Sequence, residues 1–275
     1  MSERIIIEKV SPAKWTATFS NAPINLIDNQ MLDELSSLIG QMETDPTLKV
    51  VVFRSANPDF FLAHADVTAN FQQIMEKTFG ARGMQFYTQL HVRLARAPLA
   101  TIAEIDGRAR GAGSEIVLAC DMRFGSLEGA VLGHFEVASG TVPGGNPAAR
   151  LAGLMGRGRT LEAILAATDF DGATAERYGY INRALPRAEL RPFVDNIADR
   201  IASFDKAAIA RAKLFVDQAT LPADQVFAPA LDAFAELFSR PGPQDRLKAL
   251  VAAGLQTHSE TEMDLGRVAA EPPTT

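Results

Sequence analysis

The 275-residue chain is poor in cysteine, and Cys120 is the only one. A single thiol excludes a disulfide framework and most zinc patterns, and we expect Cys120 to be an inert core residue. Long apolar runs are also missing, since no stretch of about 18 uncharged apolar residues occurs. The sequence therefore predicts no membrane-spanning helix.

Positive charge is in the minority. The chain has 27 Lys and Arg against 33 Asp and Glu, a net charge of −6, and its basic residues are scattered. A protein that binds the phosphate backbone of nucleic acid carries a basic stripe, so we expect no nucleic-acid partner. The first residues lack the long apolar segment and the cleavage site of a signal peptide, and a cytoplasmic location is the expectation.

The overall composition is that of a globular protein, with 47% hydrophobic and 22% charged residues. The length is enough for one large domain, or for one domain with a helical extension. We predict an α/β body over residues 1–190, a helical region over 191–257 and a flexible tail over 258–275.

The order of the predicted elements favours the α/β class. Residues 4–10 and 13–20 have the β-branched and aromatic content of a hairpin, and Asp28 is placed to cap a helix that ends near residue 43. Residues 48–55 and 99–106 are nearly continuous apolar runs, which is typical of strands buried on both faces of a sheet. The other predicted elements are strands at 120–125 and 180–184, a short helix begun by Asn146-Pro147, and helices at 80–96, 160–167, 173–179, 187–203, 206–218, 222–239 and 244–255.

The segment 105–115 is the most informative part of the chain for chemistry. A buried strand leads into a turn of small residues and then into an apolar helix, whose first N–H groups have no partner within the helix. Such a turn can bind a phosphate, or a carbonyl oxygen that gains negative charge during a reaction. Gly111 and Gly113 match the first two glycines of a dinucleotide-binding motif, but Ile116 occupies the place of the third. An oxyanion site and a tight turn needed only for packing are the alternatives.

Two glutamates are candidates for acid–base chemistry. Glu115 lies in the first turn of the apolar helix, where it is either a solvated residue or a buried group beside a ligand. Glu136 is the only acid between Glu128 and Glu162, and small and apolar residues surround it. Two glutamates that converge on one site can hold and activate a water molecule, and burial raises the pKa of at least one of them.

In combination, four segments resemble the crotonase family of enoyl-CoA hydratases and isomerases, over about residues 5–255. Ala63-His64-Ala65-Asp66 resembles the first oxyanion loop of that family, and the segment 105–121 resembles the second. Phe135-Glu136-Val137, followed by the segment 140–144, resembles the part that carries the second catalytic acid, and residues 170–186 resemble a later helix and strand. The resemblance implies an α/β fold, a spiral of ββα units with a C-terminal helical region used in trimerisation.

The resemblance also implies roles for particular residues. Ala65 and Ala112 would supply backbone N–H groups to a thioester oxygen, and Glu115 and Glu136 would bind the water of a hydratase. The residues implied to bind substrate and coenzyme A lie on or beside the first oxyanion loop: Ile24, Ala63, His64 and Asp66. No metal and no cofactor other than the coenzyme A of the substrate are implied, and the other histidines, His91, His134 and His258, show no metal spacing.

The chain departs from the family pattern at three places. His64 stands where the family has glycine, a position at which a positive φ would strain a histidine. It would reshape the oxyanion loop or place an imidazole near the CoA or the acyl group. Phe135 replaces a proline and would narrow the pocket around Glu136, and the segment 249–256 lacks a lysine that many relatives place near the CoA phosphate. Candidates for the acyl pocket wall are Phe71, Met75, Phe79 and Met84, and His134 is a candidate neighbour of the pocket.

The function implied is addition of water across the 2,3-double bond of an acyl-CoA thioester, in fatty acid metabolism, by a trimer or a dimer of trimers. An isomerase in which Glu136 alone moves a proton is an alternative, as is a hydrolase of a CoA thioester or a diketone. A non-catalytic relative that binds acyl-CoA or RNA is a further alternative, against which the two glutamates and the net charge argue.

Overall fold

The computed structural model of the chain describes residues 2–68 and 84–271, which form two sheets and their covering helices. In spatial order, the strands of the larger sheet are β1 (Ile5–Ser11), β2 (Lys14–Phe19), β3 (Val50–Ser55), β5 (Ala100–Ile105), β7 (Met122–Ser126) and β10 (Arg183–Leu185). Those of the smaller sheet are β4 (Phe60–Leu62), β6 (Arg108–Arg110), β8 (Val131–Gly133) and β9 (Phe170–Asp171). The larger sheet is parallel apart from the β1–β2 hairpin, which confirms the predicted hairpin.

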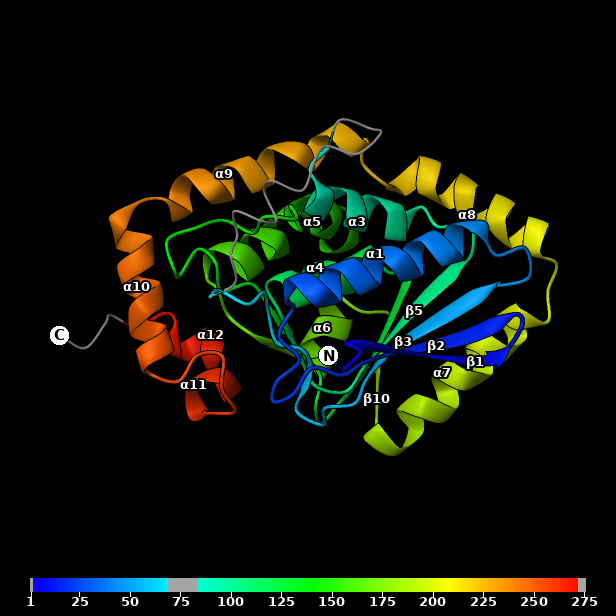
Figure 1. The fold of residues 1–275 in the computed structure, drawn as a ribbon, viewed down its shortest axis with the longest axis horizontal. Helices are drawn as coiled ribbons and strands as arrows, with labels where there is room; N and C mark the ends of the chain where they lie inside the picture. The colour runs from blue at the N-terminus through cyan, green and yellow to red at the C-terminus, as the bar shows by residue number, and fades with distance from the viewer. Residues whose placement is uncertain (1, 69–83, 272–275) are drawn as a thin grey trace.

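The helices lie on both sides of the sheets and extend beyond them at the C-terminal end (Figure 1). Before residue 180 they are α1 (Asn29–Thr44), α3 (Phe86–Ala95), α4 (Ala112–Ala119), α5 (Ala148–Leu165) and α6 (Gly172–Tyr178). After it they are α7 (Arg187–Ala202), α8 (Lys206–Thr220), the 3₁₀ turn η1 (Asp224–Val226), α9 (Ala228–Phe238), α10 (Pro241–Ala252), α11 (Glu260–Met263) and α12 (Leu265–Val268).

The strand β3 is buried on both faces, as its continuous apolar run predicts. Val50 and Val52 belong to the same buried cluster as Leu190 and Val194 of α7. The alternate residues Val51 and Phe53 belong to the main core, with the apolar face of α1. Successive side chains of a strand point to opposite faces, so one strand supplies both layers. In Figure 1, α1 and α7 accordingly lie on opposite sides of the sheet.

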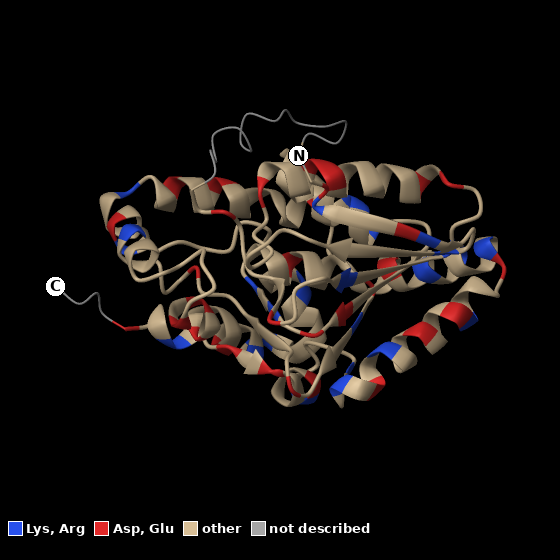
Figure 2. Ribbon diagram, turned by 60° about the horizontal axis from the view of Figure 1, so that its bottom comes forward, with Lys and Arg blue, Asp and Glu red and all other residues tan. Residues whose placement is uncertain are grey.

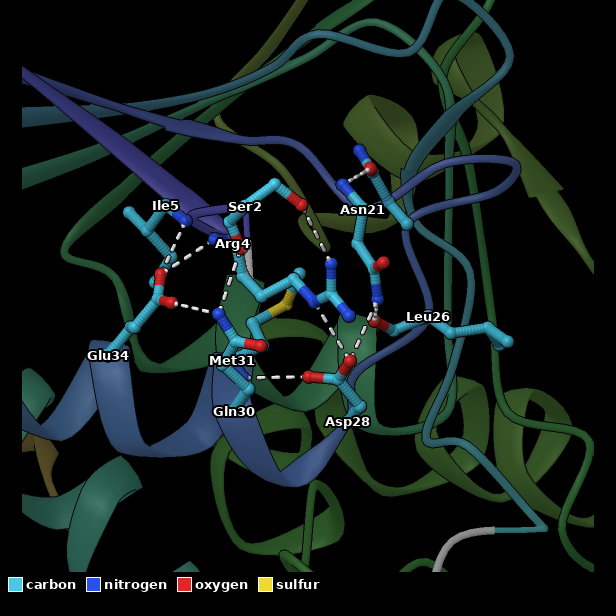
Figure 3. A network of polar contacts seen from close by, with 10 residues as sticks. Ser2, Arg4, Ile5, Asn21, Leu26, Asp28, Gln30, Met31 and Glu34 are labelled. Carbon is cyan, nitrogen blue, oxygen red and sulfur yellow. Dashed lines mark hydrogen bonds and ion pairs between the residues drawn. The ribbon is translucent and has the colours of Figure 1, made fainter.

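The N-terminus of α1 is tied to β1 by a polar network (Figure 3). Asp28 accepts a hydrogen bond of 2.8 Å from the Met31 N–H, which confirms it as the N-cap, and its other oxygen pairs with Arg4 at 2.9 Å. Glu34, one turn later, accepts the N–H groups of Arg4 and Ile5 at 2.7 and 2.8 Å. Asp28 therefore both caps α1 and helps to fix the position of that helix beside the edge strand β1.

The helix α4 begins at a turn that only small residues can form. Gly111 has a φ of +49°, in the region that favours glycine. At Gly113, a Cβ atom would lie 2.2 Å from the Leu62 carbonyl oxygen, so the helix packs directly on the backbone of β4. Gly113 is thus used for contact within the chain, which argues against the dinucleotide-binding alternative.

The C-terminal part differs from prediction in three ways. The strand expected at 180–184 is β10, which begins at Arg183, and the helix expected at 222–239 is η1 followed by α9. The flexible tail expected over 258–275 is wrong for the described part, because α11 and α12 place Glu262 and Leu265 in the interior with 0% exposure. A helix break near Gly156 is confirmed by its φ of +77° within α5.

Charged residues of both signs are interspersed over the described part of the chain (Figure 2). Within residues 2–68 and 84–271, no helix is both long and apolar enough to cross a membrane.

Candidate active site

A cavity opens where the loop after β4, the start of α4, the loop 135–144 and the helices α9 and α10 meet. It contains five residues that the sequence singled out from separate segments: His64, Ala65, Ala112, Glu115 and Glu136. The rest of its lining is mostly apolar and comprises Ile27, Leu32, Val67, Tyr87, Gly111, Phe135, Ser139, Thr141, Gly144, Leu231, Phe234, Phe238, Pro243 and Leu247. A mostly apolar cavity with a few convergent polar groups is typical of a small-molecule site.

Glu115 is a buried carboxyl group held by two donors. Its Oε2 accepts the Tyr87 hydroxyl at 2.5 Å, and its Oε1 accepts the Gly145 N–H at 2.8 Å. A Cβ atom at Gly145 would lie 2.6 Å from Oε2, so glycine there lets the backbone reach the carboxylate. Burial, and then repulsion by Glu136, raise the pKa of Glu115 to about 7. The expectation that burial raises one of the two pKa values is confirmed, and the group can exchange a proton near neutral pH.

Glu136 has a different environment although it faces the same cavity. Its Oε2 is buried and has no hydrogen-bond partner among the described residues. His134 Nδ1 lies 3.7 Å from that oxygen, and His134 Nε2 lies 2.9 Å from the hydroxyl of Tyr180. Gly111 makes room for the carboxylate, because a Cβ atom there would lie 2.9 Å from Oε1 of Glu136. Glu136 is therefore held by fewer hydrogen bonds than Glu115, and His134 lies directly beside its buried Oε2.

Ala65 and Ala112 line the cavity, and their backbone N–H groups have no acceptor among the described residues. Ala112 is the first residue of α4, where an N–H has no partner within the helix. Ala65 forms a bridge with Ile27 in which the flanking groups pair: Ile27 N–H donates to His64 O, and Asp66 N–H donates to Ile27 O, each at 2.9 Å. Neither Ala N–H donates to an acceptor within residues 2–68 and 84–271. Two such donors at one cavity can stabilise negative charge on an oxygen.

His64 does not have the strained backbone that the sequence suggested. The described non-glycine residues with positive φ are Asn25, Asn146, Ala167 and Gln256. Its ring is 1% exposed and packs edge-on against Phe135, with 5.3 Å between the ring centroids. The imidazole pairs with Glu262 of α11 at 2.7 Å, a residue that sequence reasoning placed in a flexible tail.

Three predicted binding residues lie away from the cavity lining. Ile24 and Ala63 are both 0% exposed and pack with Phe60 in a small core cluster. The Ala63 N–H and carbonyl are both paired with backbone groups, so neither its side chain nor its backbone polar groups are open to a ligand here. Asp66 accepts the Thr68 N–H at 2.9 Å and the Gln256 amide at 2.5 Å.

The apolar wall of the cavity comes from a part of the chain that the sequence did not suggest. Phe71, Met75 and Phe79 lie outside the described residues. Met84 packs with Val92 and Phe227 instead of facing the cavity. In its place the lining includes four apolar residues of α9 and α10: Leu231, Phe234, Phe238 and Leu247. In Figure 1, α9 and α10 extend from the α/β body and turn back at its side.

Tyr87 and Glu262 are the two functional-site contacts that sequence reasoning missed. Tyr87 lies 28 positions before its partner Glu115, and Glu262 lies 198 positions after His64. Helical spacing places Tyr87 on the buried face of α3 together with Leu90 and Leu94, which was the available signal. Nothing local in the sequence indicates Glu262.

Cys120 and His91 are buried in the core and do not line the cavity. Cys120 is buried as predicted, and burial raises the pKa of its thiol to about 12. The pKa of His91 is lowered to about 3, mainly by burial and to a smaller extent by repulsion from the positive charge of Arg150. Among the described residues, no three His, Cys, Asp or Glu side chains are grouped as metal ligands would be.

Comparison with known proteins agrees with this fold. Residues 15–263 match the model of the enoyl-CoA hydratase/isomerase family. The chain is 28% identical to a short-chain-enoyl-CoA hydratase of Clostridium acetobutylicum and 27% identical to a crotonyl-CoA hydratase of Syntrophomonas wolfei, covering 90% and 91% of this chain and 94% of each relative. A crystal structure of a candidate enoyl-CoA hydratase from Streptomyces avermitilis superimposes with a TM-score of 0.93 at 39% identity, over 99% of this chain and 98% of that one.

The fold is therefore the crotonase fold, an α/β body of parallel sheets with a C-terminal helical region. Because the family model matches most of the chain, the likeness extends beyond the fold to membership of a family of enzymes. The chain belongs to the enoyl-CoA hydratase/isomerase family.

Proposed function

We propose that this protein adds water across the 2,3-double bond of an acyl-CoA thioester. The observation that carries the proposal is that one mostly apolar cavity is lined by two buried carboxyl groups and by two residues, Ala65 and Ala112, whose backbone N–H groups have no acceptor among the described residues. Relatives of nearly the same length are named as hydratases of short-chain enoyl-CoA and of crotonyl-CoA, which supports the same reaction class here.

In the proposed reaction the thioester oxygen accepts the Ala65 and Ala112 N–H groups. One of the two glutamates takes a proton from water while the water oxygen forms a bond to C3. The π electrons of the double bond move through C2 to the thioester oxygen, and the other glutamate gives its proton to C2 as the enolate collapses. One water is added, and the two glutamates together neither gain nor lose a proton.

Two effects, stabilisation of the oxyanion and acid–base catalysis by a carboxyl group, would make this arrangement effective. Removal of one oxyanion donor typically lowers kcat about 10²–10³-fold. Acid–base help from a positioned carboxyl group is typically worth about 10²–10⁴-fold. The raised pKa of Glu115, about 7, suits it to give or take a proton near neutral pH.

The test is hydration of crotonyl-CoA and of a longer 2-enoyl-CoA, followed as loss of the conjugated absorbance. We expect Glu115→Gln and Glu136→Gln each to lower kcat by about 10²–10⁴-fold. The exposed Glu176, on α6 and away from the cavity, provides the matched control Glu176→Gln. Absence of turnover by the wild type, with coenzyme A thioesters still bound in calorimetry, would overturn hydration in favour of other chemistry on the same ligand. Absence of binding would also overturn the ligand class and leave the non-catalytic or RNA-binding alternative to be tested.

A double-bond isomerase is the second candidate, because one specific contact favours it. Both oxygens of Glu115 are engaged, by Tyr87 and by Gly145, whereas Oε2 of Glu136 has no partner among the described residues. Glu136 alone could then carry a proton between C2 and C4 of a 3-enoyl-CoA. A rise in conjugated absorbance from 3-enoyl-CoA that survives Glu115→Gln but not Glu136→Gln would identify the isomerase.

We propose further that the protein forms a homotrimer or a dimer of trimers. The helix α8 exposes a run of three apolar side chains, Leu214, Phe215 and Val216, to solvent. Adjacent exposed apolar side chains indicate an interaction surface, which a second copy of this chain would cover. The predicted cytoplasmic location, the place in fatty acid metabolism and the lack of a cofactor other than the substrate's coenzyme A stay predictions.

A further inference from the structure

Both ring nitrogens of His64 face hydrogen-bond acceptors. Nδ1 lies 2.7 Å from the carbonyl oxygen of Ala65, and Nε2 lies 2.7 Å from Oε1 of Glu262. A carbonyl oxygen has no hydrogen to donate, so Nδ1 must carry one. The neutral ring has a single N–H, and the state of the pair therefore depends on where the second proton lies, on Nε2 or on Glu262.

The surroundings of Glu262 place that second proton on the imidazole. Its Oε1 also accepts the N–H of Gln256 at 2.7 Å. Donation from Nε2 would make this oxygen accept twice, as an ionised carboxylate does. Oε2 of Glu262 is buried and has no hydrogen-bond partner among the described residues, so a proton on Oε2 would have no acceptor. With the second proton on Nε2, both nitrogens of His64 carry hydrogens and the ring, 1% exposed, is a cation.

The electrostatic balance is consistent with an ion pair. Burial by itself lowers the pKa of His64, but attraction to Glu262 and the hydrogen bond between them outweigh it, so the pKa is raised. Burial raises the pKa of Glu262, yet the paired histidine brings it below its ordinary value. Arg110 of β6 is the other charged group that acts on His64, and its guanidinium is itself paired with Asp169 at 2.6 Å.

This ion pair holds the residue whose N–H borders the cavity. His64 contacts the Ala65 carbonyl directly, and its own carbonyl accepts the Ile27 N–H at 2.9 Å. On the other side of Ala65, Asp66 accepts the side-chain amide of Gln256 at 2.5 Å. Gln256 and Glu262 of the C-terminal segment therefore hold both neighbours of Ala65.

We propose that His64 is a buried imidazolium which, paired with Glu262, positions the Ala65 N–H toward the thioester oxygen, so that Gln256 and Glu262 of the C-terminal segment help to position the site. His64 acts here as a positioning residue. The positioning part rests on the proposed function, whereas the charge state of His64 does not.

The charge state is measured first, by ¹⁵N nuclear magnetic resonance of the imidazole rings at about pH 8. An ordinary histidine, with a pKa of about 6.5, is neutral there. We expect the His64 ring, assigned by loss of its signals in His64→Gln, to show two protonated nitrogens. In Glu262→Gln we expect one. A neutral His64 ring in the wild type would overturn the proposal.

Positioning is measured by kinetics and by a readout that needs no turnover. We expect His64→Gln to lower kcat by about 10²-fold, the size of effect of an ångström-scale misplacement, while KM changes by less than about threefold. Butyryl-CoA labelled with ¹³C at the thioester carbonyl cannot be hydrated, because it has no double bond. Its isotope-edited infrared band should shift to lower frequency on binding the wild type, and shift less in His64→Gln.

Two further variants keep the test decisive. His64→Gln leaves Glu262 as a buried charge without a partner, which destabilises a fold, so the double variant His64→Gln/Glu262→Gln, without either charge, is measured with it. His258 pairs with Asp59 at 2.9 Å on the surface of the same segment, and His258→Gln is the matched control. We expect the loss of kcat and of the carbonyl shift in the folded double variant but not in the control.

Wild-type kcat and a full carbonyl shift in the double variant would overturn the positioning role. Failure of butyryl-CoA to bind the wild type would overturn the positioning role together with the proposed function. In that event the ring measurement still decides whether His64 is an imidazolium.

Discussion

The hydroxyl of Tyr87 donates a hydrogen bond of 2.5 Å to Oε2 of Glu115, from α3 to the first turn of α4. This bond favours the ionised form of the carboxyl group, and so it opposes the effect of burial on the pKa of Glu115. The pKa of about 7 is the balance of these opposing effects. A single phenol therefore helps to set the proton affinity of the site.

The pH–rate profile of Tyr87→Phe tests this balance. Removal of the hydroxyl takes away an interaction that lowers the pKa of Glu115, so we expect the inflection in kcat/KM assigned to this group to move to higher pH. Tyr178, whose hydroxyl lies 3.3 Å from Glu162 at an exposed position, supplies the control Tyr178→Phe. An unchanged or lowered inflection in Tyr87→Phe would contradict the assignment.

Glu115 is also expected to cost stability at higher pH. Its pKa is 4.5 ordinarily and about 7 in the folded chain, so between these values the folded state binds more protons than the unfolded state and stability falls as pH rises. We expect Glu115→Gln to become more stable relative to the wild type from about pH 5 to about pH 8, by ~3 kcal/mol. Urea unfolding at both pH values measures the difference, and Glu176→Gln should show none. A constant difference between wild type and Glu115→Gln across this range would show that the carboxyl group does not titrate there.

The oxyanion role of Ala112 can be tested without disturbing α4. Ala112 is the first residue of that helix, a position where proline is tolerated because its N–H has no helical partner. We expect Ala112→Pro to remove the donor and to lower kcat by about 10²–10³-fold, with the fold retained by circular dichroism. Ala112→Gly keeps the N–H and should retain most of the activity. Equal losses in the two variants would point to the space around residue 112 instead of its N–H.

The assembly prediction concerns Phe215 on α8. This side chain is 66% exposed, next to Val216 at 60%. We expect the wild type to elute with the mass of three or six chains in light scattering after gel filtration, and Phe215→Glu to give smaller species, because aromatic side chains contribute strongly to interfaces. Leu165 on α5 is also 60% exposed, and Leu165→Glu is the control. A monomeric wild type would contradict the prediction.

Local pattern in the sequence was enough for much of the α/β body. The apolar run of β3, the capping by Asp28 and the small residues at the start of α4 are patterns of residues that lie close together in the sequence, and the structure agrees with each. The two glutamates could be identified because carboxyl groups stand out in apolar surroundings. Their shared cavity could be inferred only through the family resemblance.

The tertiary structure alone decided which residues contact the functional side chains of the site. Tyr87 reaches Glu115 and Glu262 reaches His64 across long stretches of chain, and α9 supplies the apolar wall that the sequence placed elsewhere. These contacts depend on how whole helices pack against one another. Hydrophobic periodicity and helix capping cannot predict that packing, because both describe only residues that are neighbours along the chain. The sequence by itself thus determined the chemical groups of the site, and packing determined their pKa, their charge and the residues that hold them in place.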